Sequence, residues 1–206
     1  MRRPPLPPAN RLPVRAALAV LALTWLSGNL AQAASPLRGP PHHRTTVPHS
    51  AAPCVHLSAR LPHMGRALCD AAELVPTEGR SSQGRTLYAR DVVAPQARLR
   101  VLVVGAMHGD EMSSASVALH WIQHALKEPA DAHWRFIPVL NPDGLLARPA
   151  RRVNARGVDL NRNFPTPNWA SDAKVYWEQR TKKDPRRWPG PSPLSEPESR
   201  FLHDEM

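Results

Sequence analysis

The chain has 206 residues, a length that favours a single domain. Its 27 basic and 17 acidic residues give a formal net charge of +10. A basic surface favours anionic partners such as cell-wall polymers or nucleic acids. The arginines are scattered, however, and the sequence contains no base-recognition motif, so we expect no nucleic-acid partner.

Residues 1–33 are predicted to form a secretory signal peptide. Four arginines make the start of the chain basic, and the apolar run Ala16–Leu26 is shorter than the roughly 20 residues of a membrane span. Ala31–Ala33 then offers a small-residue cleavage site. We therefore expect a periplasmic or secreted bacterial protein with no stable membrane anchor after cleavage. A retained N-terminal anchor is the alternative.

Residues 34–53 are predicted to be a disordered linker. They are rich in Pro, His, Arg and Thr and contain almost no large apolar residues, so they cannot bury a core. Cys54 and Cys69 follow this segment and are the only cysteines in the sequence. Because export leads to an oxidising compartment, we favour a disulfide between them over two free buried thiols.

From Cys54 onward the pattern is that of a globular domain. It predicts strands at 85–93, 99–104 and 134–140, a helix that is capped by Ser113 or Ser114 and ends near Lys127, and a turn at 141–144 (NPDG). A strand, a helix and a strand in this order form a βαβ unit, and therefore a parallel pair in an α/β sheet. The segment 167–193 is polar and rich in Pro and is expected to be a surface excursion. Residues 195–198 (SEPE) predict a capping box that opens a further helix.

The sequence HGDE at 108–111 is the first candidate for chemistry. It follows a predicted buried strand and precedes a helix, and ligands of open α/β sheets gather at the carboxyl ends of strands. His108 offers an imidazole nitrogen and Glu111 offers a carboxylate oxygen. A catalytic zinc ion uses such donors and keeps one position open for water. This placement favours a metal site at His108 and Glu111.

The second candidate lies about fifty residues downstream and is rich in arginine and asparagine. The Arg162 guanidinium can bind a carboxylate through two parallel hydrogen bonds, and Asn161 adds a neutral donor to the same anion. Arg152 can polarise a carbonyl and stabilise the oxyanion that develops on it. Metal donors, an arginine for the reacting carbonyl and an Asn–Arg pair for a terminal carboxylate together indicate an exopeptidase. A solvated basic loop is the alternative.

Together these motifs closely resemble the zinc carboxypeptidase family, and within it the short bacterial branch of murein peptide amidases. The similarity rests on HGDE, on NPDG, on GVDLNRNFP at 157–165 and on SEPE, in that order, and it spans roughly residues 79–203. It implies an α/β fold with a mixed, largely parallel sheet and helices on both faces. Residues 54–206 would be the N-terminal part of the catalytic domain, incomplete at the C-terminus.

The resemblance also implies a role for each matching residue. His108 and Glu111 match two ligands of a single zinc ion, and Asp159 matches the acidic residue that orients the histidine ligand. Arg152 matches the arginine that polarises the scissile carbonyl, and Asn161 and Arg162 match the pair that binds the free carboxylate of the substrate. The family's third zinc ligand and its general-base glutamate match no residue of this chain.

The resulting prediction is a zinc-dependent carboxypeptidase or peptide amidase that hydrolyses an amide next to a free carboxylate, with murein peptides as the expected substrate. Two alternatives stay open. If the reading frame ends at Met206, the product is an inactive remnant that at most binds peptide carboxylates. A deacylase of N-acyl amino acids is the second alternative, and the motifs NPDG and GVDLNRNFP argue against it.

Overall fold

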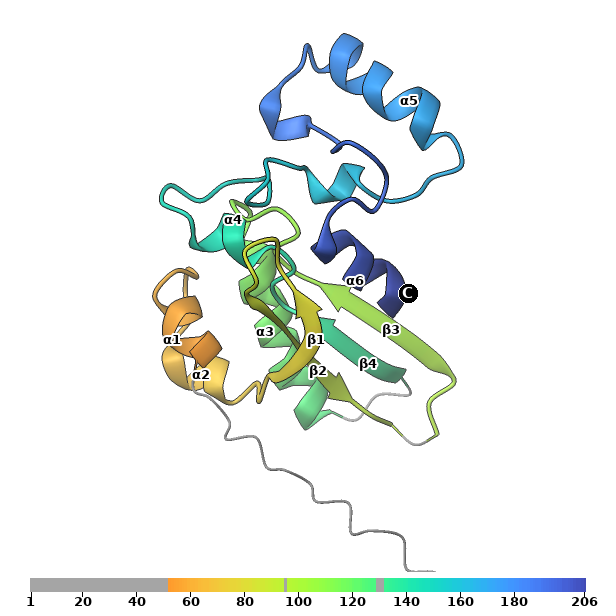
Figure 1. Ribbon diagram of the computed structural model, residues 1–206. Coiled ribbons are helices and arrows are strands. Elements are labelled where there is room, and N and C mark those ends of the chain that lie inside the picture. The colour runs from red at the N-terminus through yellow and green to blue at the C-terminus, as the bar shows by residue number, and fades with distance from the viewer. Residues whose placement is uncertain (1–51, 95, 129–131) are drawn as a thin grey trace, which may run out of the picture. The chain divides into compact units, whose positions relative to one another are not determined.

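Four strands form one mixed sheet in the order β1-β2-β4-β3 (Figure 1). The computed structural model describes residues 52–94, 96–128 and 132–206. The predicted signal peptide and almost all of the predicted linker lie outside these residues. The strands are β1 (Val75–Arg80), β2 (Thr86–Val92), β3 (Leu99–Val104) and β4 (Ala132–Ile137).

Helices and short helical turns connect and cover the strands. They are α1 (Ala52–Ser58), α2 (Arg66–Asp70), α3 (Met112–Lys127), α4 (Pro142–Leu146), η1 (Leu160–Arg162), α5 (Trp169–Val175), η2 (Tyr176–Arg180), η3 (Pro185–Arg187) and α6 (Pro197–Glu205). No helix among the described residues has both the length and the apolar character needed to cross a membrane. The first of these helices, α1, begins at Ala52, which is two residues before the expected start of the globular region.

The predicted βαβ unit is confirmed. β3 and β4 pair in parallel from Leu99 opposite Ala132 to Val104 opposite Ile137, and α3 connects them. β2 pairs with β4, and β1 with β2, in the antiparallel sense. The expected mixed sheet is therefore present, but its parallel part is limited to β3 and β4 within the described residues.

Two apolar clusters lie on opposite faces of this sheet. Phe136 belongs to the cluster that contains α3, whereas Ile137 belongs to the cluster that contains Leu202 of α6. Successive side chains of a strand point to opposite faces, so this division follows from β4 itself. Helices on both faces were expected and are confirmed.

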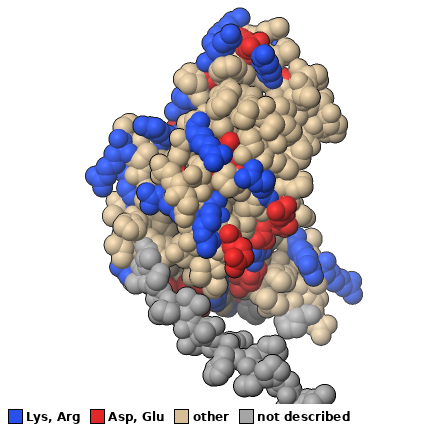
Figure 2. Space-filling view, viewed as in Figure 1, with Lys and Arg blue, Asp and Glu red and all other residues tan. Residues whose placement is uncertain are grey.

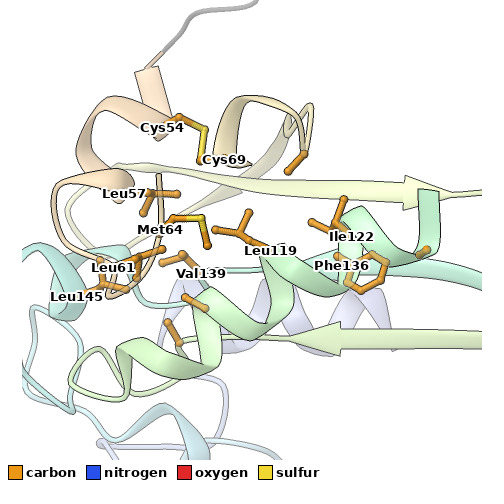
Figure 3. Close-up of a cluster of buried hydrophobic side chains, with 14 residues drawn as sticks. Cys54, Leu57, Leu61, Met64, Cys69, Leu119, Ile122, Phe136, Val139 and Leu145 are labelled. Atoms are coloured by element: carbon orange, nitrogen blue, oxygen red, sulfur yellow. A yellow bond between two sulfur atoms is a disulfide. The ribbon is translucent and has the colours of Figure 1, made fainter. Parts of the chain in front are cut away.

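The helices α1 and α2 extend the first cluster beyond the sheet (Figure 3). A disulfide joins Cys54 of α1 to Cys69 of α2, with their Cα atoms 5.6 Å apart. Leu57 and Met64 pack beneath it, together with Leu119 of α3. The bond therefore fixes two very short helices over the apolar side of α3.

Three local expectations need correction. The helix α3 begins at Met112, and Ser114 does not cap it: the Ser114 hydroxyl donates to the Glu111 carbonyl and accepts from the Ala106 amide. Instead of a turn, residues 142–146 form the single-turn helix α4. The SEPE sequence makes no capping box, because the Glu198 carboxylate accepts a hydrogen bond from the distant amide of Ser82.

The strand β3 is also less buried than its composition suggests. Its residues are exposed or half-buried, with Leu99 at 60% exposure. It is an edge strand of the described sheet, so the prediction of a buried strand from the apolar run was wrong. Lysine and arginine side chains are spread over the face drawn in Figure 2 rather than gathered in one patch.

Candidate metal centre

The loop after β3 is held beside the segment that follows β4. Parallel pairing continues past the strands, because the Gly105 amide donates to the Ile137 carbonyl and the Leu140 amide donates back to the Gly105 carbonyl. The amide of Asn141 then donates to the carbonyl of Ala106. The loop that carries His108 and Glu111 therefore begins next to the NPDG segment, at the carboxyl end of the parallel pair.

The glycine of HGDE allows the closest backbone approach in this region. A Cβ atom at Gly109 would lie 2.2 Å from the carbonyl carbon of Gly144 and 2.5 Å from the carbonyl oxygen of Arg151. The Gly109 amide donates to the carbonyl of Arg152, and the Asn141 side chain donates to the same oxygen. The NPDG and HGDE motifs thus position the backbone of Arg152 between them.

Four of the predicted side chains form a closed ring of contacts. His108 Nε2 lies 3.1 Å from Asp159 Oδ1, and the other oxygen of Asp159 accepts from Arg152 Nε at 3.1 Å. A second nitrogen of Arg152 lies 3.1 Å from Glu111 Oε1. The ring closes where Glu111 Oε2 lies 3.0 Å from His108 Nδ1. Two cationic or basic groups thus alternate with two carboxylates.

Burial and charge act in opposite directions on this ring. Asp159 is 0% exposed, and burial alone would raise its pKa, but the His108 and Arg152 side chains outweigh that effect and lower the pKa. Burial alone would lower the pKa of His108, and the Asp159 and Glu111 carboxylates outweigh it and raise the pKa. Without a bound cation, the ring therefore favours a protonated imidazole between two carboxylates.

The donor geometry fits a zinc ion. Zinc binds imidazole nitrogen and carboxylate oxygen at about 2.0–2.2 Å, so two tetrahedral donors on one ion lie about 3.4 Å apart. The observed 3.0 Å between His108 Nδ1 and Glu111 Oε2 needs only a small opening. Asp159 accepts from Nε2, which leaves the Nδ1 lone pair for the metal. No cluster of three or more His, Cys, Asp or Glu side chains suited to a metal occurs among the described residues.

The predicted carboxylate-binding pair lies next to the ring but does not join it through side chains. Asn161 and Arg162 belong to η1, which Asp159 caps by accepting from the Asn161 amide. The Asn161 side chain is exposed. The Arg162 guanidinium lies over the ring of Tyr176, 5.5 Å from its centroid, and donates to the Asn161 carbonyl. Asp159 therefore connects the candidate metal donors to η1 through one carboxylate.

Several residues that support the site were not singled out from the sequence. The Asn163 side chain donates to the carbonyls of Pro189 and Ser192, and its oxygen accepts from the Glu196 amide. It fastens the end of the 167–193 segment to η1. The backbone carbonyl of Trp188 accepts from the Asp159 amide at 2.8 Å. These partners are 26 to 33 residues apart in the sequence, so no local pattern indicated them.

Asn154 and the SEPE segment form a second buried polar group. Asn154 donates to Glu196 at 2.8 Å and to Glu198 at 3.3 Å, and its side-chain oxygen accepts from the amides of Arg156 and Val158. The signal in the sequence was the string RVNARGVD, whose asparagine fits a turn before Gly157. This asparagine shapes the loop between Arg152 and Asp159.

A mixed α/β sheet with imidazole and carboxylate donors after its parallel strand makes this an α/β protein with a candidate metal centre at the carboxyl end of that strand. The family model of the zinc carboxypeptidases matches residues 63–206. The chain therefore belongs to the zinc carboxypeptidase family, whose members are metal-dependent hydrolases.

Individual relatives agree with this assignment. Murein peptide amidase A of Escherichia coli K12 is 37% identical over 130 residues, which are 60% of this chain and 52% of that protein. The catalytic chain of human carboxypeptidase N is 30% identical over 126 residues, which are 48% of this chain and 28% of that protein. The chain thus spans about half the length of the murein peptide amidase A that it matches.

A solved structure supports the fold. Carboxypeptidase A of Helicoverpa armigera superposes with a TM-score of 0.52 at 24% identity, over 67% of this chain and 39% of that one. At this identity the likeness concerns the fold alone. The predicted zinc carboxypeptidase fold is confirmed by this comparison and by the family match.

Proposed function

We propose that this chain forms part of an exported zinc peptidase that hydrolyses an amide bond next to a free carboxylate, with murein peptides as its substrate. The ring of His108, Glu111, Arg152 and Asp159 is the observation that carries the proposal. Export, by the predicted signal peptide at 1–33, and a periplasmic or secreted location belong to the same proposal.

In this proposal His108 and Glu111 hold the zinc ion. When bound, the ion supplies a Lewis acid that activates water and polarises a carbonyl. Asp159 fixes the imidazole orientation through Nε2, and keeps Nδ1 turned to the metal. A further protein ligand and a general base are needed for this chemistry, and we propose that both lie outside the described residues.

Arg152 acts on the scissile carbonyl. Its side chain is only 7% exposed and is held at Nε by Asp159, so the terminal nitrogen that now contacts Glu111 is presented in a fixed direction. If Glu111 held the metal instead, that nitrogen would be free to donate to the oxyanion that develops on the scissile carbonyl. The carboxylate–arginine contact thus pre-organises the catalytic arginine.

Asn161 and Arg162 bind the carboxylate of the leaving residue. Stacking on Tyr176 supports the guanidinium from one side. The exposed Asn161 amide adds a donor on the same short helix. The choice of murein peptide over other peptides rests on the similarity to murein peptide amidase A, half of whose length this chain covers.

Paired peptide substrates test this function. The protein that contains this chain should release the C-terminal residue from a peptide with a free carboxylate, should spare the same peptide with a C-terminal amide, and should lose activity to a chelator and regain it with zinc. Equal cleavage of both peptides, or activity that withstands chelation, contradicts the proposal. No cleavage of either peptide by the metal-loaded protein favours the inactive remnant instead.

A further inference from the structure

Arg60 connects the N-terminal helices to the NPDG segment. It follows α1 and is half-buried. Its guanidinium donates to the carbonyl of Leu145 at 3.0 Å and to the carbonyl of Ala147 at 2.7 Å, which lie 85 and 87 residues further along the chain. These two oxygens lie at the end of α4, where the last carbonyls of a helix lack intrahelical partners. One planar guanidinium therefore satisfies the end of this short helix from a distant part of the chain.

The peptide backbone that Arg60 holds is packed against the glycine of HGDE. A Cβ atom on Gly109 would lie 2.3 Å from the amide nitrogen of Leu145. The carbonyl oxygen of the same Leu145 accepts from Arg60. The Leu145 backbone therefore contacts both the Arg60 guanidinium and the loop that carries His108 and Glu111. Backbone packed this closely transmits a displacement from one side to the other.

The position of Arg60 is itself determined by the N-terminal helices. The amides of Arg60 and Leu61 both donate to the carbonyl of Leu57, which defines the turn after α1. Leu57 and Leu61 are buried in the same apolar cluster as Leu145 (Figure 3). The disulfide joins α1 to α2 over this cluster. A helix of seven residues is not stable by itself, so the disulfide and the cluster decide where Arg60 is placed.

The contact made by Arg60 is separate from the motifs that identified the family. The helix α1 and Arg60 precede residues 63–206, which the family model matches. The disulfide joins this preceding helix to α2, which lies inside the matched region. Asn141 and Asp159, which contact the HGDE loop from other sides, also lie inside it. The N-terminal helices thus add a contact that the family match does not account for.

We infer that the disulfide-linked segment 52–70 holds the HGDE loop in position, and that Arg60 is the residue through which it does so. Arg60 binds backbone carbonyls of α4 rather than substrate or metal, so it is a positioning residue. That the loop binds zinc rests on the proposed function, whereas the hold on the loop does not.

Hydrogen exchange of the full chain, measured with a chelator present, tests the hold itself. The Gly109 amide donates to the carbonyl of Arg152, so its exchange reports on opening of the loop. The amide of Leu119, in the buried part of α3, reports on unfolding of the core. Arg60→Gln should raise the Gly109 rate about tenfold more than the Leu119 rate, the size of effect that loss of one charge-assisted hydrogen bond produces. A general loss of stability would raise both rates alike.

Two further variants keep this measurement decisive. Arg80→Gln is the matched control, because Arg80 also donates to two carbonyls, but they belong to its own strand. It should leave the ratio of the two exchange rates unchanged. Arg60→Lys keeps the charge without the planar fork, should show a smaller increase than Arg60→Gln, and replaces it if the glutamine variant does not fold. A ratio equal to that of the wild type in the folded Arg60 variants overturns the inference.

The disulfide is tested by the double variant Cys54→Ser, Cys69→Ser. It removes both cysteines of the sequence, so no thiol remains to bind metal. The Gly109 amide should again exchange faster relative to the amide of Leu119. Adding Arg60→Gln to this variant should increase the rate less than it does in the wild type, because both changes act through one contact. Fully additive effects contradict a route from the disulfide through Arg60.

Titration with zinc alone separates this inference from the proposed function. Calorimetry should show that Arg60→Gln weakens zinc binding about tenfold, as loss of a residue that orients a metal ligand does. If zinc binding requires His108 but is equally tight in Arg60→Gln and the wild type, the inference fails and the proposed function stands. If the Gly109 exchange depends on Arg60 but no zinc binds at His108, the hold on the loop stands and the proposed function fails.

Discussion

His108 and Asp159 lie 3.1 Å apart across a buried contact between two loops that are 51 residues apart in the sequence. The carboxylate accepts from Nε2 and, through its other oxygen, from Arg152. One buried acid thus fixes both a candidate metal ligand and the candidate catalytic arginine. The arrangement has consequences for titration, stability and binding that can be measured one by one.

Replacement of Asp159 by asparagine should lower the pKa of His108. In the metal-free protein the pKa is raised because carboxylates outweigh burial, so removal of the Asp159 charge leaves burial with less opposition. A raised histidine pKa stabilises the fold below the unfolded pKa, near 6.5, and this stabilisation is lost as the pH rises through the folded value. The free energy of unfolding should therefore decrease less in Asp159→Asn than in the wild type as the pH rises from the unfolded to the folded pKa of His108.

Imidazole NMR of the chelated protein measures this change directly. Asp172→Asn is the control, since Asp172 lies on α5 and, within the described part of the chain, its carboxylate accepts hydrogen bonds only from Asn168 and Ser171. If the His108 pKa is the same in Asp159→Asn and in the wild type, the contact with Asp159 does not raise that pKa.

Gly109→Ala should destabilise the protein by about 1–3 kcal/mol, the usual cost of overpacking. The added Cβ would meet backbone atoms of Gly144, Leu145 and Arg151 at 2.2–2.5 Å, and backbone cannot move aside as a flexible side chain can. Urea denaturation measures the change. Gly65→Ala is the matched control, because nothing lies within 4 Å of a Cβ there. An equal effect of the two substitutions would contradict the close packing of the HGDE and NPDG motifs.

Arg162→Gln should raise KM for peptides with a free C-terminal carboxylate by about tenfold or more, because a charge-assisted pair is lost. Cleavage of the corresponding amidated peptide, already slow, should change little. Arg200→Gln provides a comparison, since Arg200 of α6 donates to the carbonyls of Leu194 and Ser195, which precede that helix. If Arg162→Gln lowers kcat and leaves KM unchanged, the assignment of Arg162 to carboxylate binding is wrong.

Glu198 should make the protein relatively less stable at neutral pH. It is 0% exposed, and burial raises its pKa more than the hydrogen bonds from Ser82 and Asn154 lower it. As the pH rises above the unfolded pKa, near 4.3, the unfolded chain loses its proton before the folded one, so the free energy of unfolding falls. This cost is complete once the pH has passed the raised folded value.

Glu198→Gln removes that titration. The free energy of unfolding of the variant, relative to the wild type, should therefore rise between pH 4 and pH 8 when both are unfolded in urea. Glu178→Gln, at a half-buried position of η2, is the comparison variant. A difference between Glu198→Gln and wild type that is constant with pH would contradict the account of the buried carboxylate.

Much of the sheet was predictable because its signals are local. The run Leu99–Val104 gave the bounds of β3, and the periodicity of the following helix gave its end at Lys127. The start of α3 was misplaced because Ser114 bonds with the loop that precedes it instead of with the first turn of the helix. A hydroxyl near a helix start has several partners within reach, and the sequence does not say which one it takes.

Sequence motifs predicted which residues form the candidate site, but not which residues hold them in place. Motif spacing named the four residues of the ring, which the structure brings together. The anchoring roles of Asn163 and Glu198 depend on partners that are tens of residues away, so composition and periodicity carry no sign of them. The capping box predicted at SEPE was wrong for the same reason. Its last glutamate, Glu198, has the spacing of a capping residue, but its carboxylate accepts from the distant amide of Ser82.

Zinc binding to His108 tests the central claim most directly. Calorimetry of the purified chain should give one zinc ion per chain, with affinity that falls at least tenfold in His108→Gln. His124→Gln should bind as the wild type does, because His124 is exposed on α3 and pairs only with Glu128 among the described residues. If His108→Gln binds zinc as tightly as the wild type, or if His124→Gln is the variant that loses the ion, then the ring around Asp159 is not the metal centre.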